Sequence, residues 1–361
     1  MQAAILEAFG TPLLLQELAD PRPLAGEVVV DVVAAPVLPY AAEVFSGARQ
    51  YPLLLPLAVG SGAVGRVRSV GPDTTRLAPG DWVYCDPTVR ARDEPVAPDI
   101  LLQGLIAPSP GAQRLQAHFR HGPFAEQLLL PLENAIPLGA LEPAEAARWC
   151  GLGLCLVPYG GLLAADLQAG ETILISGATG HFGSAAVAVA LAMGAGCVIA
   201  PGRNEAVLAD LVRRFGSRVR PVRLSGDENE DQRRMQRAAP GRIDKVLDLL
   251  PPLPDAAPVR AAAQTVRPHG TVVLMGGLRV GLELNYAHLM RHCITVRGQY
   301  MYPRQAPAQL IALIRAGLLS LDEWKITTFS LSQVNAAVAH TAHTGEAFQS
   351  TILLPGDVAF K

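Results

Sequence analysis

The chain has 361 residues, half of them hydrophobic, and a formal net charge of −2 at pH 7. A chain of this length favours two domains, and this hydrophobic content excludes a solvated, disordered polypeptide. The near-neutral charge is untypical of a nucleic-acid scaffold, which would show a basic face, so we expect no nucleic-acid partner.

The first part of the chain predicts an antiparallel, β-rich domain. Short alternating or β-branched runs at 27–33, 63–70 and 81–84 are separated by proline and glycine turns, which is the pattern of strands in such a domain. The strand-like start has no basic segment followed by a cleavage site, so we expect a cytoplasmic protein. Residues from about 86 to 120 are rich in proline and predict a long loop or an excursion.

The most informative stretch is an apolar run, Thr172–Ser176, followed by a glycine-rich turn and a run of small apolar residues. A strand, a glycine turn and a helix in this order are typical of the phosphate-binding turn of a dinucleotide fold. Gly177 and Gly180 allow the backbone to approach a pyrophosphate, and Gly183 lets the helix pack closely on the sheet. The helix N-terminus then offers unpaired N–H groups to the phosphates.

Short apolar runs after this turn support the dinucleotide fold, although Ala178 replaces the first glycine of the usual G-x-G-x-x-G pattern. Runs at 197–200, 219–224, 245–248 and 271–275 alternate with helix-compatible sequence, which predicts a doubly wound parallel sheet of the α/β class. A sheet of this kind that binds no nucleotide is the alternative. The uncharged stretch 173–202 holds a strand, a turn, a helix and a strand in series, so we expect no membrane span.

The identity of the cofactor is encoded at the end of the second strand of this sheet. NAD-binding sites usually place an acid there for the ribose hydroxyls, whereas this chain has Gly202-Arg203-Asn204 and no acid until Glu205. Arg203 is suited to a forked contact with a 2′-phosphate, and Gly202 leaves room for that phosphate. We therefore expect NADP(H). The alternative is that Arg203 is a solvated loop residue.

The order of these motifs resembles the medium-chain dehydrogenase/reductase superfamily over nearly the whole chain. The segments that carry the resemblance are Gly60–Val67, Leu77–Val83, Gly122–Glu126, Leu167–Gly177 and Arg267–Gly276. The resemblance implies a GroES-like β-barrel domain at 1–140, completed by 301–361, and a Rossmann NADP-binding domain at 141–300. It also implies a small-molecule substrate, and a homodimer formed by pairing of the sixth strands near 294–299.

The metal ligands of the zinc-dependent members of that superfamily are missing from this sequence. Leu38 and Ser61-Gly62 stand where those enzymes carry a cysteine and a His-Glu pair. The five cysteines form no C-x-x-C pair and no structural zinc lobe, which fits a reducing cytosol. His118 and His121 form an H-x-x-H pair, but a catalytic zinc needs three ligands. We therefore expect no metal, and the chain resembles the zinc-free branch of quinone and enone reductases.

Two tyrosines are candidates for the proton donor or for the wall of the substrate pocket. Tyr51 stands in Gly47-Ala-Arg-Gln-Tyr51-Pro52, which is similar to the segment where enoyl thioester reductases of the superfamily carry a proton donor, although the spacing is longer by one residue. Tyr40 lies where relatives place pocket residues. The resemblance thus implies catalytic roles for Tyr51 and Tyr40, with packed loop aromatics as the alternative.

The remaining candidates bind the cofactor, and they follow the glycine turn and the ends of three other strands. These are Ala178, Thr179, Gly180, His181, Phe182, Gly183, Gly202, Arg203, Asn204, Leu250, Gly276 and Gly277. The sequence favours an NADPH-dependent reductase of quinones or α,β-unsaturated carbonyl compounds. Two alternatives remain open, an alcohol or carbonyl oxidoreductase of the same superfamily and a non-catalytic NADPH-binding protein, because Val157-Pro158-Tyr159 also departs from the pattern of the zinc-free branch.

Overall fold

The computed structural model describes residues 1–356. Contacts divide the described chain into a first unit, Met1–Gly153 with Leu321–Gly345 and residues 349–356, and a second unit, Leu154–Ser320 with Glu346–Phe348. The limits predicted from the sequence, 1–140 with 301–361 and 141–300, differ at both ends of the second unit. Residues 301–320 group with the second unit, where the Tyr159 hydroxyl donates to Gln309 Oε1 at 3.4 Å.

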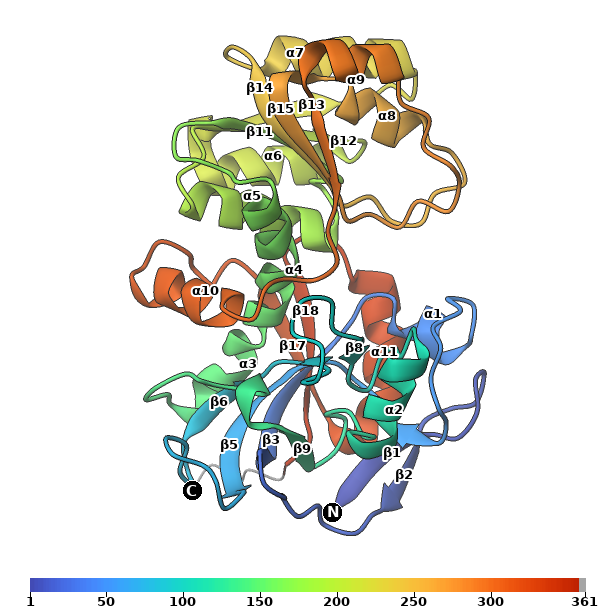
Figure 1. The fold of residues 1–361 in the computed structure, drawn as a ribbon, viewed down its shortest axis with the longest axis vertical. Helices are drawn as coiled ribbons and strands as arrows, with labels where there is room; N and C mark the ends of the chain where they lie inside the picture. Colours follow the sequence, from blue (N-terminus) through green and yellow to red (C-terminus); the bar gives the residue numbers. More distant parts are fainter. Residues whose placement is uncertain (357–361) are drawn as a thin grey trace. The chain divides into compact units, whose positions relative to one another are not determined.

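The second unit is built on a six-stranded sheet in which every neighbouring pair of strands is parallel (Figure 1). The strand order is β13-β12-β11-β14-β15-β16, which is the order of a doubly wound dinucleotide fold with its reversal between β11 and β14. The predicted doubly wound parallel sheet is therefore confirmed. The strands are β11 (Thr172–Ser176), β12 (Cys197–Gly202), β13 (Val219–Arg223), β14 (Ile243–Asp248), β15 (Val266–Leu274) and β16 (Thr295–Gly298).

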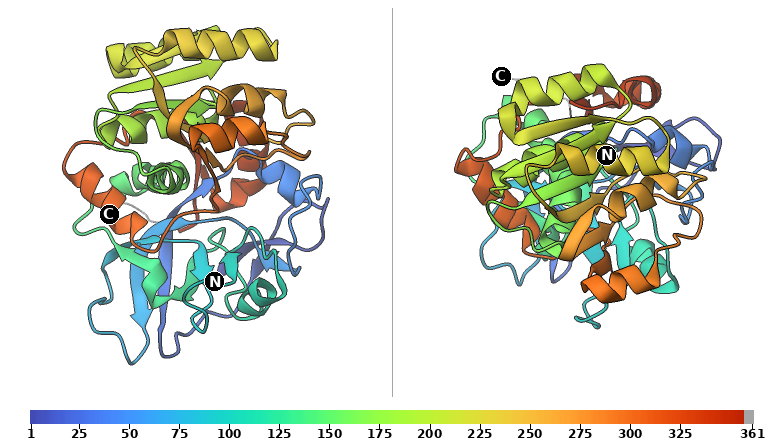
Figure 2. Two further views of the ribbon diagram at one scale, coloured as in Figure 1. Left: turned by 45° about the horizontal axis from the view of Figure 1, so that its top comes forward. Right: turned by 90° about the horizontal axis from the view of Figure 1, so that it is seen from above.

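Helices of the second unit lie against this sheet, as both views of Figure 2 show. Apolar side chains of α7 and α8 share one buried core with the central strands, including Met235, Ala262, Leu174 and Val246. Helix α6 starts at an Asn204 cap and α7 at an Asp227 cap, so each start follows from a residue with a short polar side chain. The helices are α4 (Gly151–Ala164), α5 (His181–Ala192), α6 (Glu205–Phe215), α7 (Glu228–Ala238), α8 (Ala257–Ala263), α9 (Tyr286–His292) and α10 (Ala306–Arg315).

The first unit is rich in antiparallel strands, as its alternating sequence predicts. Its largest sheet has the order β10-β6-β5-β3-β18-β17, and β9 pairs with β3. The late strands β17 and β18 pair in parallel, and β18 joins β3 in antiparallel register with Ile352 opposite Pro36. A segment from the end of the chain thus completes the sheet of the first unit.

The first unit contains two further, smaller sheets, and the bounds of its strands and α-helices follow. A three-stranded sheet has the order β2-β1-β4 and a two-stranded sheet joins β7 and β8. The strands are β1 (Gln2–Leu6), β2 (Leu14–Glu17), β3 (Glu27–Val37), β4 (Leu57–Ala58), β5 (Ala63–Val70), β6 (Trp82–Cys85), β7 (Thr88–Arg90), β8 (Ile100–Leu102), β9 (Gln127–Pro131), β10 (Ala135–Pro137), β17 (Lys325–Ser330) and β18 (Gln349–Leu354). The helices are α1 (Ala41–Phe45), α2 (Pro110–His118), α3 (Ala146–Trp149) and α11 (Val334–Thr344).

The proline-rich stretch at 86–120 contains more regular structure than its sequence predicts. It holds the β7–β8 hairpin and helix α2, and these elements bury a small core that includes Val89, Leu101 and Phe119. Helix α2 begins with Ser109, whose hydroxyl accepts from Ala112 N at 3.1 Å, and with proline in its first turn. A capping serine followed by proline is a helix-start signal, so this part of the excursion could have been predicted.

One stretch of the described residues, Pro143–Ala164, is long and apolar enough to cross a membrane by length and composition. Its most apolar window is 72% buried inside the fold. A helix that forms part of a protein core passes the same test, so this finding is weak evidence for a span.

Candidate functional site

The glycine turn of the second unit is held by close approaches of backbone atoms. Gly177 has a φ of +87°, which favours glycine, and Gly180 N donates to Gly177 O at 2.9 Å. A Cβ atom on Gly183 would lie 1.9 Å from Gly177 O, so only glycine allows the first turn of α5 to pack there. Gly180 is the N-cap of α5, and the turn therefore presents the start of that helix at the carboxyl end of β11, where a phosphate binds well.

Thr179 and His181 of this turn have neighbours on other segments of the second unit. A Cβ atom on Gly202 would lie 2.3 Å from Thr179 Cγ2, so the end of β12 packs directly on the turn. Burial lowers the pKa of His181 to about 4, and the Glu346 backbone acts weakly in the opposite direction. Within residues 1–356, His181 Nδ1 is buried and has no hydrogen-bond partner. The neutral ring therefore leaves one acceptor unfilled beside the turn.

The residues that follow β12 differ in what their side chains contact. Asn204 accepts from Val207 N at 3.2 Å and caps α6, so its side-chain oxygen is engaged in the fold. Arg203 is exposed and makes no hydrogen bond or ion pair with another residue of the described chain. Glu205 forms an ion pair with Arg223 at 3.0 Å. The first acid after β12 is thus already paired, while Arg203 keeps its N–H groups for a ligand or for water.

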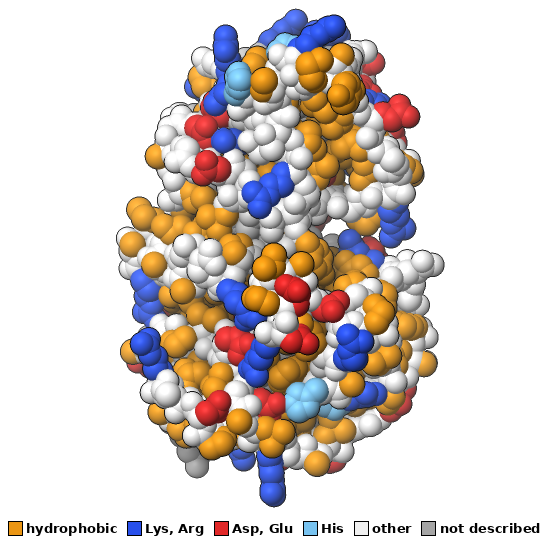
Figure 3. Space-filling view, viewed as in Figure 1, with side chains coloured by type: hydrophobic (Ala, Val, Ile, Leu, Met, Phe, Trp, Pro, Cys, Tyr) orange, Lys and Arg blue, Asp and Glu red, His pale blue; other side chains and the backbone are white. Residues whose placement is uncertain are grey.

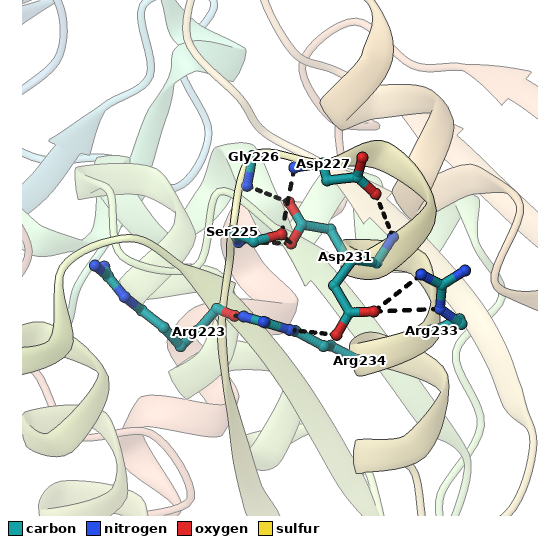
Figure 4. A network of polar contacts seen from close by, with 8 residues as sticks. Arg223, Ser225, Gly226, Asp227, Asp231, Arg233 and Arg234 are labelled. Atoms are coloured by element: carbon teal, nitrogen blue, oxygen red, sulfur yellow. Dashed lines mark hydrogen bonds and ion pairs between the residues drawn. The ribbon is translucent and has the colours of Figure 1, made fainter.

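The loop after β13 is fixed by a polar network, drawn in Figure 4. The Asp231 carboxylate accepts from Ser225 N at 2.6 Å, from the Ser225 hydroxyl at 2.7 Å and from Gly226 N at 3.0 Å. The Arg234 guanidinium donates to Arg223 O at 3.0 Å. Because Arg223 pairs in register with Gly202, the network holds the ends of two neighbouring strands at the edge where Arg203 lies.

Asp248 is a candidate residue that the sequence analysis missed. It ends β14 opposite Ser176 of β11, at the point where the strand order reverses, and its side chain is 3% exposed. Burial raises the pKa of Asp248 to about 6, although hydrogen bonds from the Leu250 and Gly276 backbones and from Ser176 favour the charged form. An acid ending a buried apolar strand at the reversal point is the signal that could have identified it.

Asp248 organises the loops that carry three of the predicted cofactor residues. A Cβ atom on Gly276 would lie 2.2 Å from Asp248 Oδ2, and Leu250 N approaches Asp248 Oδ1 at 3.4 Å. Gly277 N donates to Leu250 O at 2.8 Å. The ends of β11, β14 and β15 therefore meet around one buried carboxyl group. The predicted roles of Leu250, Gly276 and Gly277 toward a cofactor stay predictions.

The two predicted catalytic tyrosines lie together in the first unit. The rings of Tyr40 and Tyr51 are 6.3 Å apart in an edge-to-face arrangement. A third residue, which the sequence analysis did not single out, joins them: Arg49 Cζ lies 4.0 Å from the centre of the Tyr40 ring and 5.5 Å from that of Tyr51. We call Tyr40, Arg49 and Tyr51 the tyrosine–arginine cluster. It offers phenol hydroxyl groups and a cation, which are groups that can hold a carbonyl oxygen.

The described part of the first unit shows how the candidate metal-binding side chains are arranged. Within residues 1–356, no three His, Cys, Asp or Glu side chains come together to hold an ion. His118 is hydrogen-bonded to the buried Glu27 carboxylate, and His121 Nδ1 accepts from Ala58 N at 3.0 Å. The H-x-x-H pair thus has other partners. Cys85 is buried, and this burial raises the pKa of its thiol.

Comparison with known proteins agrees with the two-part architecture. Residues 24–140 match the family described as alcohol dehydrogenase GroES-like domain, and residues 182–316 match the family described as zinc-binding dehydrogenase. An alcohol dehydrogenase-type protein of Mycobacterium tuberculosis, alcohol dehydrogenase D, is 26% identical over 92% of this chain and 94% of its own. The acryloyl-coenzyme A reductase of Metallosphaera sedula is 28% identical over 61% of this chain and 63% of its own.

A solved structure has the same fold over the whole chain. A zinc-binding dehydrogenase-type protein of Sinorhizobium meliloti 1021, bound to NADP, has a TM-score of 0.78 and 20% identity and covers 98% of this chain and 99% of its own. The parallel sheet and the GroES-like domain are therefore both confirmed. The fold and the two family matches define the chain as an oxidoreductase of the medium-chain dehydrogenase/reductase superfamily, whose members use nicotinamide cofactors.

Proposed function

We propose that this protein is an NADPH-dependent reductase of quinones or α,β-unsaturated carbonyl compounds that works without zinc. The observation that carries the proposal is which side chains stand at the positions where the zinc enzymes of the superfamily carry their metal ligands. Leu38, Ser61 and Gly62 stand at those positions and do not match the cysteine, histidine and glutamate of the zinc enzymes. Tyr40 and Tyr51, which are close to Leu38 in the sequence, have rings that lie edge to face. Zinc does not suit this donor set, because a catalytic site needs three nitrogen, sulfur or carboxylate ligands.

The cofactor, when bound, supplies a hydride to the β-carbon of the substrate. The protein must then hold the carbonyl oxygen while negative charge develops on it, and it must supply a proton to the α-carbon or the oxygen. In our proposal the Tyr51 hydroxyl is the proton donor. Tyr51 makes no hydrogen bond with another described residue, so its hydroxyl is available to a substrate. Tyr40 forms a wall of the same site.

Two features support NADPH over NADH. Arg203 is exposed and has no partner within the described chain, and Glu205 is paired with Arg223. A guanidinium without a partner in the described chain, next to an acid that is ion-paired elsewhere, suits a 2′-phosphate better than a ribose diol, because the fork of N–H donors matches phosphate oxygens. The glycine turn would receive the pyrophosphate, with Gly177, Gly180 and Gly183 providing the space.

Reduction of a conjugated carbonyl is tested by turnover of metal-free protein. We expect NADPH oxidation with small enones or quinones after treatment with a chelator, and at least a tenfold loss of kcat in Tyr51→Phe. The matched control is Tyr286→Phe, since Tyr286 is 79% exposed in the second unit, and it should keep wild-type turnover. Tight NADPH binding without turnover across a broad panel would instead support a non-catalytic NADPH-binding protein.

An alcohol or carbonyl oxidoreductase is the second candidate, and the names of several relatives favour it. Alcohol dehydrogenases are prominent among the similar proteins, including that of Rhizobium meliloti, which is 30% identical over 54% of this chain. Stoichiometric zinc by elemental analysis, together with alcohol oxidation that stops when the metal is removed, would decide for this candidate. An unchanged rate after metal removal would decide against it.

We also propose a homodimer formed through the edge strand β16. All four residues of β16 are exposed, including Val296 at 37%, and helix α9, which precedes β16 in the chain, exposes Tyr286 at 79% and Met290 at 58%. Among the described strands β16 pairs only with β15, and the open edge of a strand near exposed apolar side chains is a surface that another strand can extend. Light scattering should give a dimer mass, and Val296→Lys should lower it; a monomer at micromolar wild-type protein would contradict the proposal.

Small-molecule substrates suit the surface better than nucleic acid. On the face drawn in Figure 3, basic and acidic side chains are interspersed and do not gather into one basic surface. This distribution and the net charge of −2 support the expectation that the protein has no nucleic-acid partner.

A further inference from the structure

Arg49 is placed in the tyrosine–arginine cluster by a tight turn in the backbone. Helix α1 ends at Phe45, and Gly47 then adopts a φ of +81°, which reverses the direction of the chain. The turn is closed by Arg49 N, which donates to Glu43 O at 2.8 Å. This geometry returns the Arg49 side chain over Tyr40, the residue that precedes α1.

The Arg49 side chain is largely withdrawn from water. It is 16% exposed, and its guanidinium carbon lies 4.0 Å from the centre of the Tyr40 ring. Contact with an aromatic face offsets part of the cost of removing a cation from water. It does not satisfy the guanidinium N–H groups, which need hydrogen-bond acceptors.

The hydrogen-bonding capacity of this guanidinium is unused within residues 1–356. Its side-chain nitrogens make no hydrogen bond to a described residue. Its ion pair is with Glu43, at 3.7 Å from Arg49 Nη1, and the Glu43 side chain is 57% exposed. An ion pair of that length to a solvated acid compensates a mostly buried cation poorly. Within residues 1–356, Arg49 therefore has an ion-pair partner but no anion within hydrogen-bonding distance.

We propose that Arg49 recognises a carboxylate group of the substrate, so that the preferred substrates are conjugated carbonyl compounds that carry an acid. The inference rests on the proposed function, because it takes Tyr40 and Tyr51 as parts of the substrate site. A planar carboxylate matches the fork of guanidinium N–H donors and would supply the missing close anion. Glu43 acts as the resting counter-charge, which an incoming carboxylate displaces.

The test compares 4-oxopent-2-enoate with its ethyl ester, which has the same enone and no charge. We expect the wild-type protein to prefer the acid at least tenfold in kcat/KM. Arg49→Met, which keeps an unbranched stem and removes the charge, should lower the acid-to-ester ratio at least tenfold relative to wild type, a comparison in which the different intrinsic reactivities of acid and ester cancel. Arg49→Lys should retain part of the preference, because it keeps the charge and loses the fork. The exposed Arg114→Met is the matched control and should leave the ratio unchanged.

Glu43→Gln provides a result that a purely structural role for Arg49 does not predict. Removing the competing carboxylate should strengthen binding of the acid, so KM for 4-oxopent-2-enoate should fall about threefold or more while KM for the ester stays constant. An acid-to-ester ratio that is the same in wild type and Arg49→Met, or a Glu43→Gln variant with weaker affinity for the acid, would overturn the proposal. Because this variant leaves Arg49 in place, the test holds even if Arg49→Met fails to fold.

A direct binding measurement separates this inference from the proposed reaction. Levulinate, the saturated acid, is titrated into NADPH-loaded protein and followed by nucleotide fluorescence or calorimetry. Levulinate binding that weakens at least tenfold in Arg49→Met, without enone turnover in the wild type, would refute the proposed reductase and support carboxylate recognition. Enone turnover with levulinate affinity equal in wild type and Arg49→Met would support the reductase and refute carboxylate recognition.

Discussion

The glycine turn of the second unit and the tyrosine–arginine cluster of the first unit are built in different ways. The turn depends on backbone atoms that approach so closely that a single Cβ atom at Gly183 would lie 1.9 Å from Gly177 O. The cluster depends on long side chains, with Arg49 Cζ 4.0 Å from the Tyr40 ring and 5.5 Å from that of Tyr51. The glycine turn therefore tolerates almost no added side chain. In the cluster, a side chain can be replaced by one with different functional groups without altering the backbone.

This difference between the turn and the cluster suggests which parts of the fold stay the same and which change among members of the superfamily with different substrates. A backbone turn that accepts the pyrophosphate has the same task in every member, because NAD and NADP share that group. The residues around the reacting carbon decide between an alcohol, a quinone and an enone, and fold alone does not determine them. We therefore expect substitutions in the turn to damage binding and folding together, and substitutions in the cluster to alter turnover with little cost in stability.

The largest effect is expected from Gly183→Ala. The added Cβ would collide with the Gly177 carbonyl, and backbone cannot move aside as a flexible side chain can. NADPH affinity should fall at least about 100-fold, and the free energy of unfolding by about 2–4 kcal/mol, as for other overpacking substitutions. Fluorescence titration and urea unfolding measure the two effects. Gly241→Ala, where a Cβ meets nothing within 4 Å, is the control; wild-type affinity in Gly183→Ala would contradict the geometry.

The same difference explains how far the sequence could predict the structure. The parallel sheet and the turn follow from short apolar runs and glycine spacing, because local sequence determines both. The cluster of Arg49 with Tyr40 could not be predicted, since it depends on a reversal at Gly47 that no hydrophobic pattern encodes. Asp248 lies between these cases: its position at a strand end was visible, but its role depends on strand order, which brings Ser176 and Gly276 beside it.

A second prediction concerns Asp248 and pH. Its pKa in the folded protein is about 6, above that of a free aspartate, so the protonated form stabilises the fold below about pH 4, and this stabilisation is lost as pH rises through 6. The shift of about two pKa units corresponds to about 3 kcal/mol. Asp248→Asn should remove that pH dependence and gain stability relative to wild type between pH 5 and pH 8.

Urea unfolding of wild type and Asp248→Asn at pH 5 and pH 8 provides the test. The difference in free energy of unfolding between the two proteins should move by about 1.4 kcal/mol in favour of the variant at the higher pH. Asp93→Asn, at an exposed position, is the control, and its free energy of unfolding should equal that of wild type at both pH 5 and pH 8. A difference that is constant with pH would mean that burial of Asp248 does not govern its ionisation.

A smaller effect is expected from Arg203→Ala, which acts through a side chain at the edge of the turn. Loss of one charge-assisted fork should raise the NADPH dissociation constant about 10-fold and leave that for NADH unchanged, a cost of about 1.4 kcal/mol. Parallel titrations of wild type and variant with NADPH and with NADH measure the two dissociation constants. Arg237→Ala, also exposed in the second unit, should change neither constant. Equal losses for NADPH and NADH would show that Arg203 contacts something other than the 2′-phosphate.

The smallest effect on stability is expected from Tyr51→Phe, which changes one functional group of the tyrosine–arginine cluster and leaves its packing in place. The substitution keeps the ring, and with it the edge-to-face contact with Tyr40 and the approach of Arg49, and removes a hydroxyl that has no hydrogen-bond partner among the described residues. The melting temperature should stay within about 1 °C of wild type, since changes of this kind are usually within about 0.5 kcal/mol. Differential scanning calorimetry measures it. A fall of about 4 °C or more would mean that the hydroxyl supports the fold, and a loss of turnover in the variant would then no longer identify Tyr51 as the proton donor.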